Sequence, residues 1–159
     1  MKLFKNIKKW LENQEHLFYL FLLILIVPNI ILCFTEPMPV VAKVCNVLLP
    51  FAFYYLLMTL SRNCGKMFWI LFLFIFFGAF QIVLLYLFGQ SIIAVDMFLN
   101  LVTTNSSEAM ELLDNLVPAL VSVIILYIPA LILAAISIIK KRKLSPEFIR
   151  RERKKAWIA

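Results

Sequence analysis

Four long stretches of the chain contain no Asp, Glu, Lys or Arg, at residues 17–34, 44–61, 67–93 and 116–139. A helix rises about 1.5 Å per residue, and a hydrocarbon core about 30 Å thick takes about 20 residues, so each stretch is near spanning length. No stretch alternates polar with apolar residues, and a backbone in lipid must satisfy its own hydrogen bonds, which favours helices. The pattern predicts an all-α integral membrane protein with four transmembrane helices, at about residues 17–34, 40–61, 67–89 and 116–139.

The composition agrees with a membrane protein. Of the 159 residues, 64% are hydrophobic, whereas soluble domains are about half apolar. The length allows one domain. A net charge of +7 would suggest nucleic acid on a soluble domain, but in a membrane protein the placement of Lys and Arg sets the orientation instead. We therefore expect no nucleic-acid partner.

The basic residues are distributed asymmetrically about the four spans. With the exception of Lys43, every Lys and Arg lies before the first span, between the second and third, or after the fourth. The positive-inside rule then places both ends in the cytoplasm and residues 90–115 in the periplasm. The cytoplasmic basic segment at 140–155 should be attracted to the anionic inner leaflet. Trp157 follows this cluster in the way that a helix often enters the membrane interface, so we expect a truncated fifth span.

The loop at 90–115 is the extramembrane segment with internal organisation. Its apolar residues predict an interfacial helix at the outer boundary of the membrane. Residues 104–107 then suggest a break and the cap of a second short helix, with Glu108 in its first turn. Asn100, Thr104 and Glu108 recur every four residues, which places neighbours on one helix face. They form a candidate binding site for a polar headgroup or its ammonium; the alternative is a solvated face with a cap.

The remaining polar residues carry no catalytic pattern. No His, Asp, Glu or Cys cluster has the spacing of metal ligands, and no nucleophile–base set or glycine-rich loop is present. Asn29, Asn46 and Gln81 lie within spans, where hydrogen bonds between helices are the expected role. Cys33 and Cys45 both fall near the outer face, so a disulfide is conceivable, but small apolar side chains in helices are favoured.

Residues 95–113 resemble the periplasmic segment of the lipid A phosphoethanolamine transferases. That family has an Asn, a Thr four residues on, a Glu-Ala after four more, and then an acid and two Leu. The matching residues here are Asn100, Thr104, Glu108, Ala109, Glu111, Leu112 and Leu113.

The resemblance implies a bacterial inner-membrane domain of five helices, followed by a periplasmic alkaline-phosphatase-like domain with zinc and a threonine nucleophile. Such an enzyme moves phosphoethanolamine from phosphatidylethanolamine to lipid A, which weakens the binding of cationic peptides such as polymyxin. Asn100, Thr104 and Glu108 would hold the lipid headgroup, and the partners would be phospholipid and lipid A. The catalytic residues and the zinc would lie outside this chain, so the chain alone would be inactive.

Two other classes of protein fit the pattern of spans. One is a small non-enzymatic inner-membrane partner or regulatory subunit. The other is a fragment of a transporter, which is disfavoured because no ionisable residue lies in the middle of a span.

The charge distribution makes a direct prediction about topology. Cysteines introduced at Asn105 and at Lys143 should react with a membrane-impermeant thiol reagent from opposite sides of the membrane, Asn105 from the periplasm. Labelling of both positions from one side would contradict the orientation derived from the basic residues.

Overall fold

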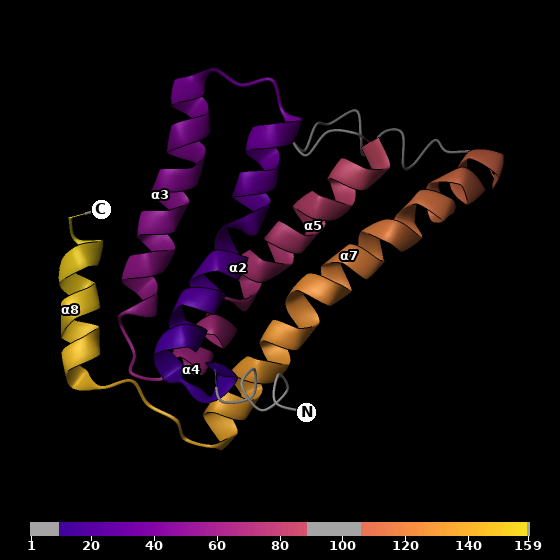
Figure 1. Ribbon diagram of the computed structural model, residues 1–159. Coiled ribbons are helices and arrows are strands. Elements are labelled where there is room, and N and C mark those ends of the chain that lie inside the picture. Colours follow the sequence, from indigo (N-terminus) through magenta and orange to yellow (C-terminus); the bar gives the residue numbers. More distant parts are fainter. Residues whose placement is uncertain (1–9, 89–105, 159) are drawn as a thin grey trace.

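The computed structural model describes residues 10–88 and 106–158, with side chains at 10–83 and 117–158. The described residues form helices and turns, with no strand among them. Figure 1 shows the order of the helices: α2 (Gln14–Thr35), α3 (Val40–Met58), α4 (Cys64–Ile70), α5 (Phe72–Phe88), α7 (Ser106–Ile139) and α8 (Pro146–Ala156).

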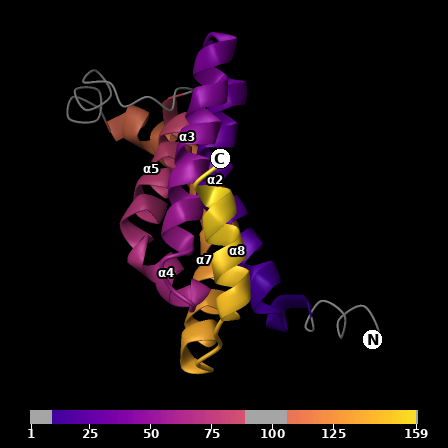
Figure 2. The same ribbon diagram turned by 90° about the vertical axis from the view of Figure 1, so that its left-hand side faces the viewer.

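The long helices run alternately up and down (Figure 1). The α2 and α3 helices form an antiparallel hairpin, α4 and α5 then lead back along the bundle, and α7 returns. The short α8 turns back once more and lies beside the second half of α3, as both Figure 1 and Figure 2 show. The end of the bundle at which α2 and α4 begin therefore also holds the link between α7 and α8.

Within the described part of the chain, three helices are long and apolar enough to cross a membrane, namely α2, α3 and residues Val117–Ile139 of α7. A fourth candidate is the pair α4 and α5, which passes the same test together but is bent by 62°. Large apolar side chains such as Leu49, Phe76 and Ile125 are exposed along these helices, which suits contact with lipid rather than water. The expected all-helical fold is confirmed for the described residues, with three or four helices long and apolar enough to span a membrane.

The third expected span, at 67–89, differs from the prediction of one straight helix. It begins earlier, at Cys64, and it bends at Leu71, where neither Gly nor Pro marks a break. Different close contacts fix the two halves: Gly65 of α4 lies against Ala134 and Ser137 of α7, whereas Gly78 of α5 lies against Pro28 of α2 and Tyr127 of α7. These contacts depend on tertiary packing, which the charge-free pattern does not reveal.

The helix expected after the break at 104–107 does begin there, but it is not a separate element. The α7 helix starts at Ser106 and continues without interruption to Ile139, with Glu108 in its first turn. Its 34 residues correspond to about 50 Å, well beyond a hydrocarbon core of about 30 Å. The first three turns of α7, which contain its acidic residues, therefore lie beyond the apolar part that would be long enough to cross the core.

The core lies where α2, α4 and α7 meet. Phe21 of α2 stacks on Phe68 of α4, with ring centroids 4.4 Å apart. Ala130, Ala134 and Ser137 of α7 are buried small residues at helical spacing, and the last two lie beside Gly65 of α4. Small residues on facing helices allow backbones to approach closely in membranes. A Cβ at Gly65 would meet the carbonyl oxygen of Ala134 and would lie 2.9 Å from the Ser137 Cβ.

The two helical glycines should therefore respond differently to alanine. Gly65→Ala should cost about 1–3 kcal/mol of stability, because the added methyl group meets a backbone carbonyl that cannot move alone. Gly78→Ala is the matched control and should cost less, since its nearest atoms belong to the side chains of Pro28 and Tyr127. Unfolding of the protein in mixed micelles with increasing denaturant measures both. Equal losses would contradict the close approach of α4 and α7.

Candidate functional site: a buried carboxylate and a basic face at one end of the bundle

The site residues predicted from the sequence lie mostly outside the described part of the chain. Asn100 and Thr104 are outside the described residues altogether, and for Glu108 the structure describes the main chain in the first turn of α7. A headgroup site formed by these three residues stays a prediction. Most of the polar groups that the structure does bring together lie at the opposite end, around α8.

The sequence of α8 defines where this helix begins. Ser145 is the N-cap, and its hydroxyl accepts a hydrogen bond from the Phe148 main-chain N–H at 3.1 Å. Pro146 occupies the first turn, where the missing N–H costs nothing, and Glu147 complements the helix dipole. Three basic residues occupy the last turn, where positive charge is favourable. Ser145 followed by Pro146 is a pairing that favours a helix start, and α8 begins there.

The link between α7 and α8 reverses the direction of the chain. Lys141 takes a left-handed conformation with φ 48°, and the N–H of Arg142 then donates to the Ser137 carbonyl at 3.0 Å. Such a left-handed residue is a common way to end a helix. Leu144 is buried, and its N–H donates to the carbonyl of Arg62 at 2.7 Å. This bond attaches the link to the turn between α3 and α4.

One face of α8 packs on the bundle. Phe148, Ile149 and Ala156 are buried. The Phe148 ring meets the rings of Phe18 and Tyr19 in α2 edge-on, at centroid distances of 5.5 and 6.0 Å. Edge-to-face pairs of this kind stabilise beyond their buried area. The α8 helix is thus seated on α2 as well as on α3.

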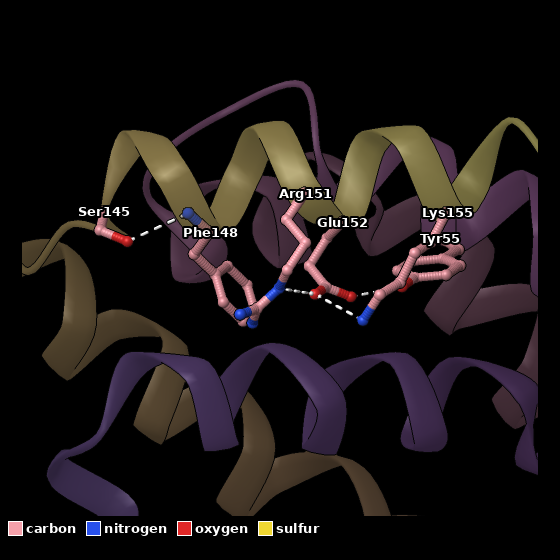
Figure 3. Close-up of polar contacts among 6 residues, drawn as sticks. All are labelled: Tyr55, Ser145, Phe148, Arg151, Glu152 and Lys155. Carbon is pink, nitrogen blue, oxygen red and sulfur yellow. Dashed lines mark hydrogen bonds and ion pairs between the residues drawn. The ribbon is translucent and has the colours of Figure 1, made fainter.

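Glu152 lies on the same buried face and is 0% exposed. Figure 3 shows its carboxylate among three donors. The Tyr55 hydroxyl of α3 donates at 2.5 Å, Arg151 Nε at 2.8 Å and Lys155 Nζ at 3.0 Å. A buried charge is tolerated when it is paired and hydrogen-bonded, and both conditions hold here. The carboxylate therefore ties α8 to α3.

The surroundings of Glu152 also shift its pKa. Burial alone raises the pKa, but hydrogen bonds from Tyr55, Arg151, Lys155 and Tyr19 outweigh burial and lower it from 4.5 to about 2. A carboxylate that accepts several hydrogen bonds in its charged form behaves in this way. Glu152 is therefore ionised wherever the docked helix exists at ordinary pH.

The opposite face of α8 is basic and exposed. Arg150, Arg153, Lys154 and Trp157 share this face at helical spacing. Together with Arg62 from the turn between α3 and α4, they line a cavity of about 530 Å³. Arg153 donates to the Thr59 carbonyl at 2.7 Å, and Arg62 Nε donates to the Leu144 carbonyl at 3.1 Å.

Two smaller polar clusters join the spans. Asn29 and Asn46 hydrogen-bond between α2 and α3, with Asn46 Nδ2 2.9 Å from the Asn29 carbonyl. This confirms the expected role of these two residues. Near the other end, the Ser137 hydroxyl of α7 donates to Gln14 Oε1 of α2 at 2.7 Å. Cys33, Cys45 and Cys64 are free thiols.

Tyr55, Glu152 and Arg62 were not identified from the sequence as site residues. The spacing of Phe148, Glu152 and Ala156 was a usable signal, because it places an acid on the apolar face of an amphipathic helix, where an acid needs a partner. The sequence does not show which residue that partner is, because Tyr55 lies in a different helix far away in the chain.

The sequence and the structure match none of the known protein families, curated proteins or solved structures with which they were compared. Among the described residues, no group of three or more His, Cys, Asp and Glu side chains is placed to hold a metal ion.

The lowered pKa of Glu152 predicts how the docking of α8 depends on pH. Because the pKa is lower in the docked state than in the released state, the carboxylate stabilises docking fully above about pH 4.5 and loses this effect as pH falls towards about 2. Glu152→Gln should therefore speed hydrogen exchange in residues 146–156 about tenfold at pH 7. The ratio between variant and wild type should approach one as the pH falls.

Glu147→Gln is the control for this experiment, because Glu147 is an exposed acid in the first turn of the same helix. It should change exchange only slightly and without the same dependence on pH. Equal effects of the two variants would show that Glu152 contributes only charge and not a specific buried contact.

Proposed function

We propose that this chain is the membrane domain of a phosphoethanolamine transferase that modifies lipid A in the inner membrane of a bacterium. The observation that carries the proposal is the pattern of Asn100, Thr104, Glu108-Ala109 and Glu111-Leu112-Leu113 within residues 95–113. The helical, membrane-type character of the chain supports it in outline.

The proposed role of the chain is to hold the donor lipid. Glu108 accepts hydrogen bonds from the ammonium of phosphatidylethanolamine, and Asn100 and Thr104 hydrogen-bond its phosphate or glycerol oxygens. A carboxylate and an ammonium form a charge-assisted hydrogen bond, which is about twice as strong as a neutral one. Glu108 lies about two turns before Leu116, where the charge-free stretch begins, which supports a position on the polar side of that boundary.

The transfer chemistry would belong to a domain outside these 159 residues. Zinc and a threonine nucleophile in that domain would act on the phosphoethanolamine group, and the membrane domain would anchor it beside the lipid. The rival function, a small non-enzymatic partner or regulatory subunit, requires no selective binding of phosphatidylethanolamine. The two proposals therefore differ in a property of this chain by itself.

The test compares Glu108→Gln with Asp114→Asn in the isolated chain and in the complete reading frame that contains it. A charge-assisted hydrogen bond contributes about 1.5–3 kcal/mol, so Glu108→Gln should lower retention of phosphatidylethanolamine about 10- to 100-fold, measured by native mass spectrometry. The same variant should lower lipid A modification by a similar factor at matched membrane levels.

Asp114→Asn is the matched control, because it removes an acid from the same helix beyond the proposed cluster. It should retain both binding and transfer. If Glu108→Gln and Asp114→Asn behave alike, Glu108 serves only the helix start. If the complete reading frame modifies no lipid A, the non-enzymatic partner is the better description.

A further inference from the structure

The cavity beside α8 brings together four basic side chains from two separate parts of the chain. Arg150, Arg153 and Lys154 come from α8, and Arg62 comes from the turn between α3 and α4. The volume of about 530 Å³ is within the range of about 300–1,000 Å³ that is usual for small-molecule sites. Ile149 and Trp157 complete one wall with apolar surface.

These four cations differ from the other basic residues of α8 in their pairing. Arg151 and Lys155 both form ion pairs with the buried Glu152. Within the part of the chain whose side chains are described, none of the four cavity residues has a carboxylate partner. Like charges gathered in one cavity repel each other, so an anion bound among them would relieve that repulsion.

Two of the four side chains are already held in place. Arg153 is bonded to the Thr59 carbonyl at the C-terminal end of α3, and Arg62 is bonded to the carbonyl of Leu144. Each guanidinium carries five N–H donors in a planar fork that suits a phosphate, and these bonds fix its position without using the whole fork. Preorganised donors reduce the entropy lost when a ligand binds.

The rim of the cavity is apolar and exposed. Trp157 is 76% exposed and Ile158, which follows it, is 87% exposed. Tryptophan is enriched where protein meets the boundary between headgroups and acyl chains. An anion with an attached acyl chain would use both the basic wall and this rim, whereas a free phosphate ion would use only the basic wall.

We propose that this cavity binds the phosphodiester headgroup of an anionic glycerophospholipid, with the acyl chain lying along Trp157 and Ile158. Arg62, Arg150, Arg153 and Lys154 bind the phosphate oxygens. Basic pockets at the ends of transmembrane helices are suited to anionic headgroups. The site is independent of the headgroup site proposed around Glu108, because it lies at the other end of the bundle and selects negative charge rather than an ammonium.

The experiment measures lipid retention by the chain in nanodiscs, using phosphatidylglycerol as the anionic probe and phosphatidylcholine as the zwitterionic comparison. The double variant Arg150→Gln/Lys154→Gln should lower the affinity for phosphatidylglycerol about 10- to 100-fold, since two charge-assisted contacts are lost. Phosphatidylcholine should be retained weakly by both proteins. Inorganic phosphate at millimolar concentration should not displace the lipid.

The matched control is Lys140→Gln/Lys143→Gln, which removes the same charge from two exposed residues of the neighbouring link that do not line the cavity. It should change the affinity less than threefold. Equal losses in the two double variants would overturn the proposal in favour of general attraction to an anionic surface. Equal retention of phosphatidylcholine, or displacement by inorganic phosphate, would also overturn it.

A second readout tests the position of the lipid. With Trp10 and Trp69 replaced by Phe, Trp157 is the single tryptophan of the chain. Phosphatidylglycerol with brominated acyl chains should quench its fluorescence strongly, and Arg150→Gln/Lys154→Gln should abolish most of this quenching. Strong quenching that persists in the double variant would place the lipid at Trp157 without the basic cavity and would contradict the proposal.

Discussion

A carboxylate removed from water needs hydrogen-bond donors on several sides, and Glu152 obtains them from α8 itself and from Tyr55 of α3. Removing a single donor would leave the remaining charge buried and poorly paired, so the arrangement is specific as well as stabilising. The orientation of α8 follows from it. Once Glu152 faces inward, Arg150, Arg153 and Lys154 must face outward, and Arg62 lies close enough to complete the cavity.

Three kinds of contact hold the described part of the bundle together, each at a different position along its length. Asparagine side chains join α2 to α3 at the end where these two helices are linked. Aromatic rings and small residues hold α2, α4 and α7 together further along. Polar main-chain groups and the Glu152 carboxylate fix the end that carries α8. Since apolar attraction between helices is weak in lipid, close packing and hydrogen bonds are the contacts expected to define such a structure.

Much of the helical architecture could be predicted from the sequence, because the absence of charge over about 20 residues has one main physical explanation. The bend at Leu71 could not be predicted, since no Gly or Pro marks it and the two halves lie against different neighbours in α2 and α7. The continuity of α7 was missed for a related reason: Ser106 and Ser107 favour a helix start, and nothing local shows that the helix then reaches Ile139. Of the candidate sites, the capped start of α8 was readable from Ser145 and Pro146, whereas the meeting of Arg62 with α8 depends on the reversal at Lys141.

The contact between Gly65 and Ala134 joins two residues that a ribosome produces far apart in time. The α2–α3 hairpin can close as soon as both helices have entered the membrane, but α4 has no partner at Gly65 until most of α7 has been made. The hydroxyl of Tyr55 lacks its partner for longer still, because the carboxylate that accepts its hydrogen bond belongs to α8. During synthesis the half-assembled bundle therefore presents an unfilled groove at α4 and an unpartnered hydroxyl on α3 until α7 and α8, which are made later, close both.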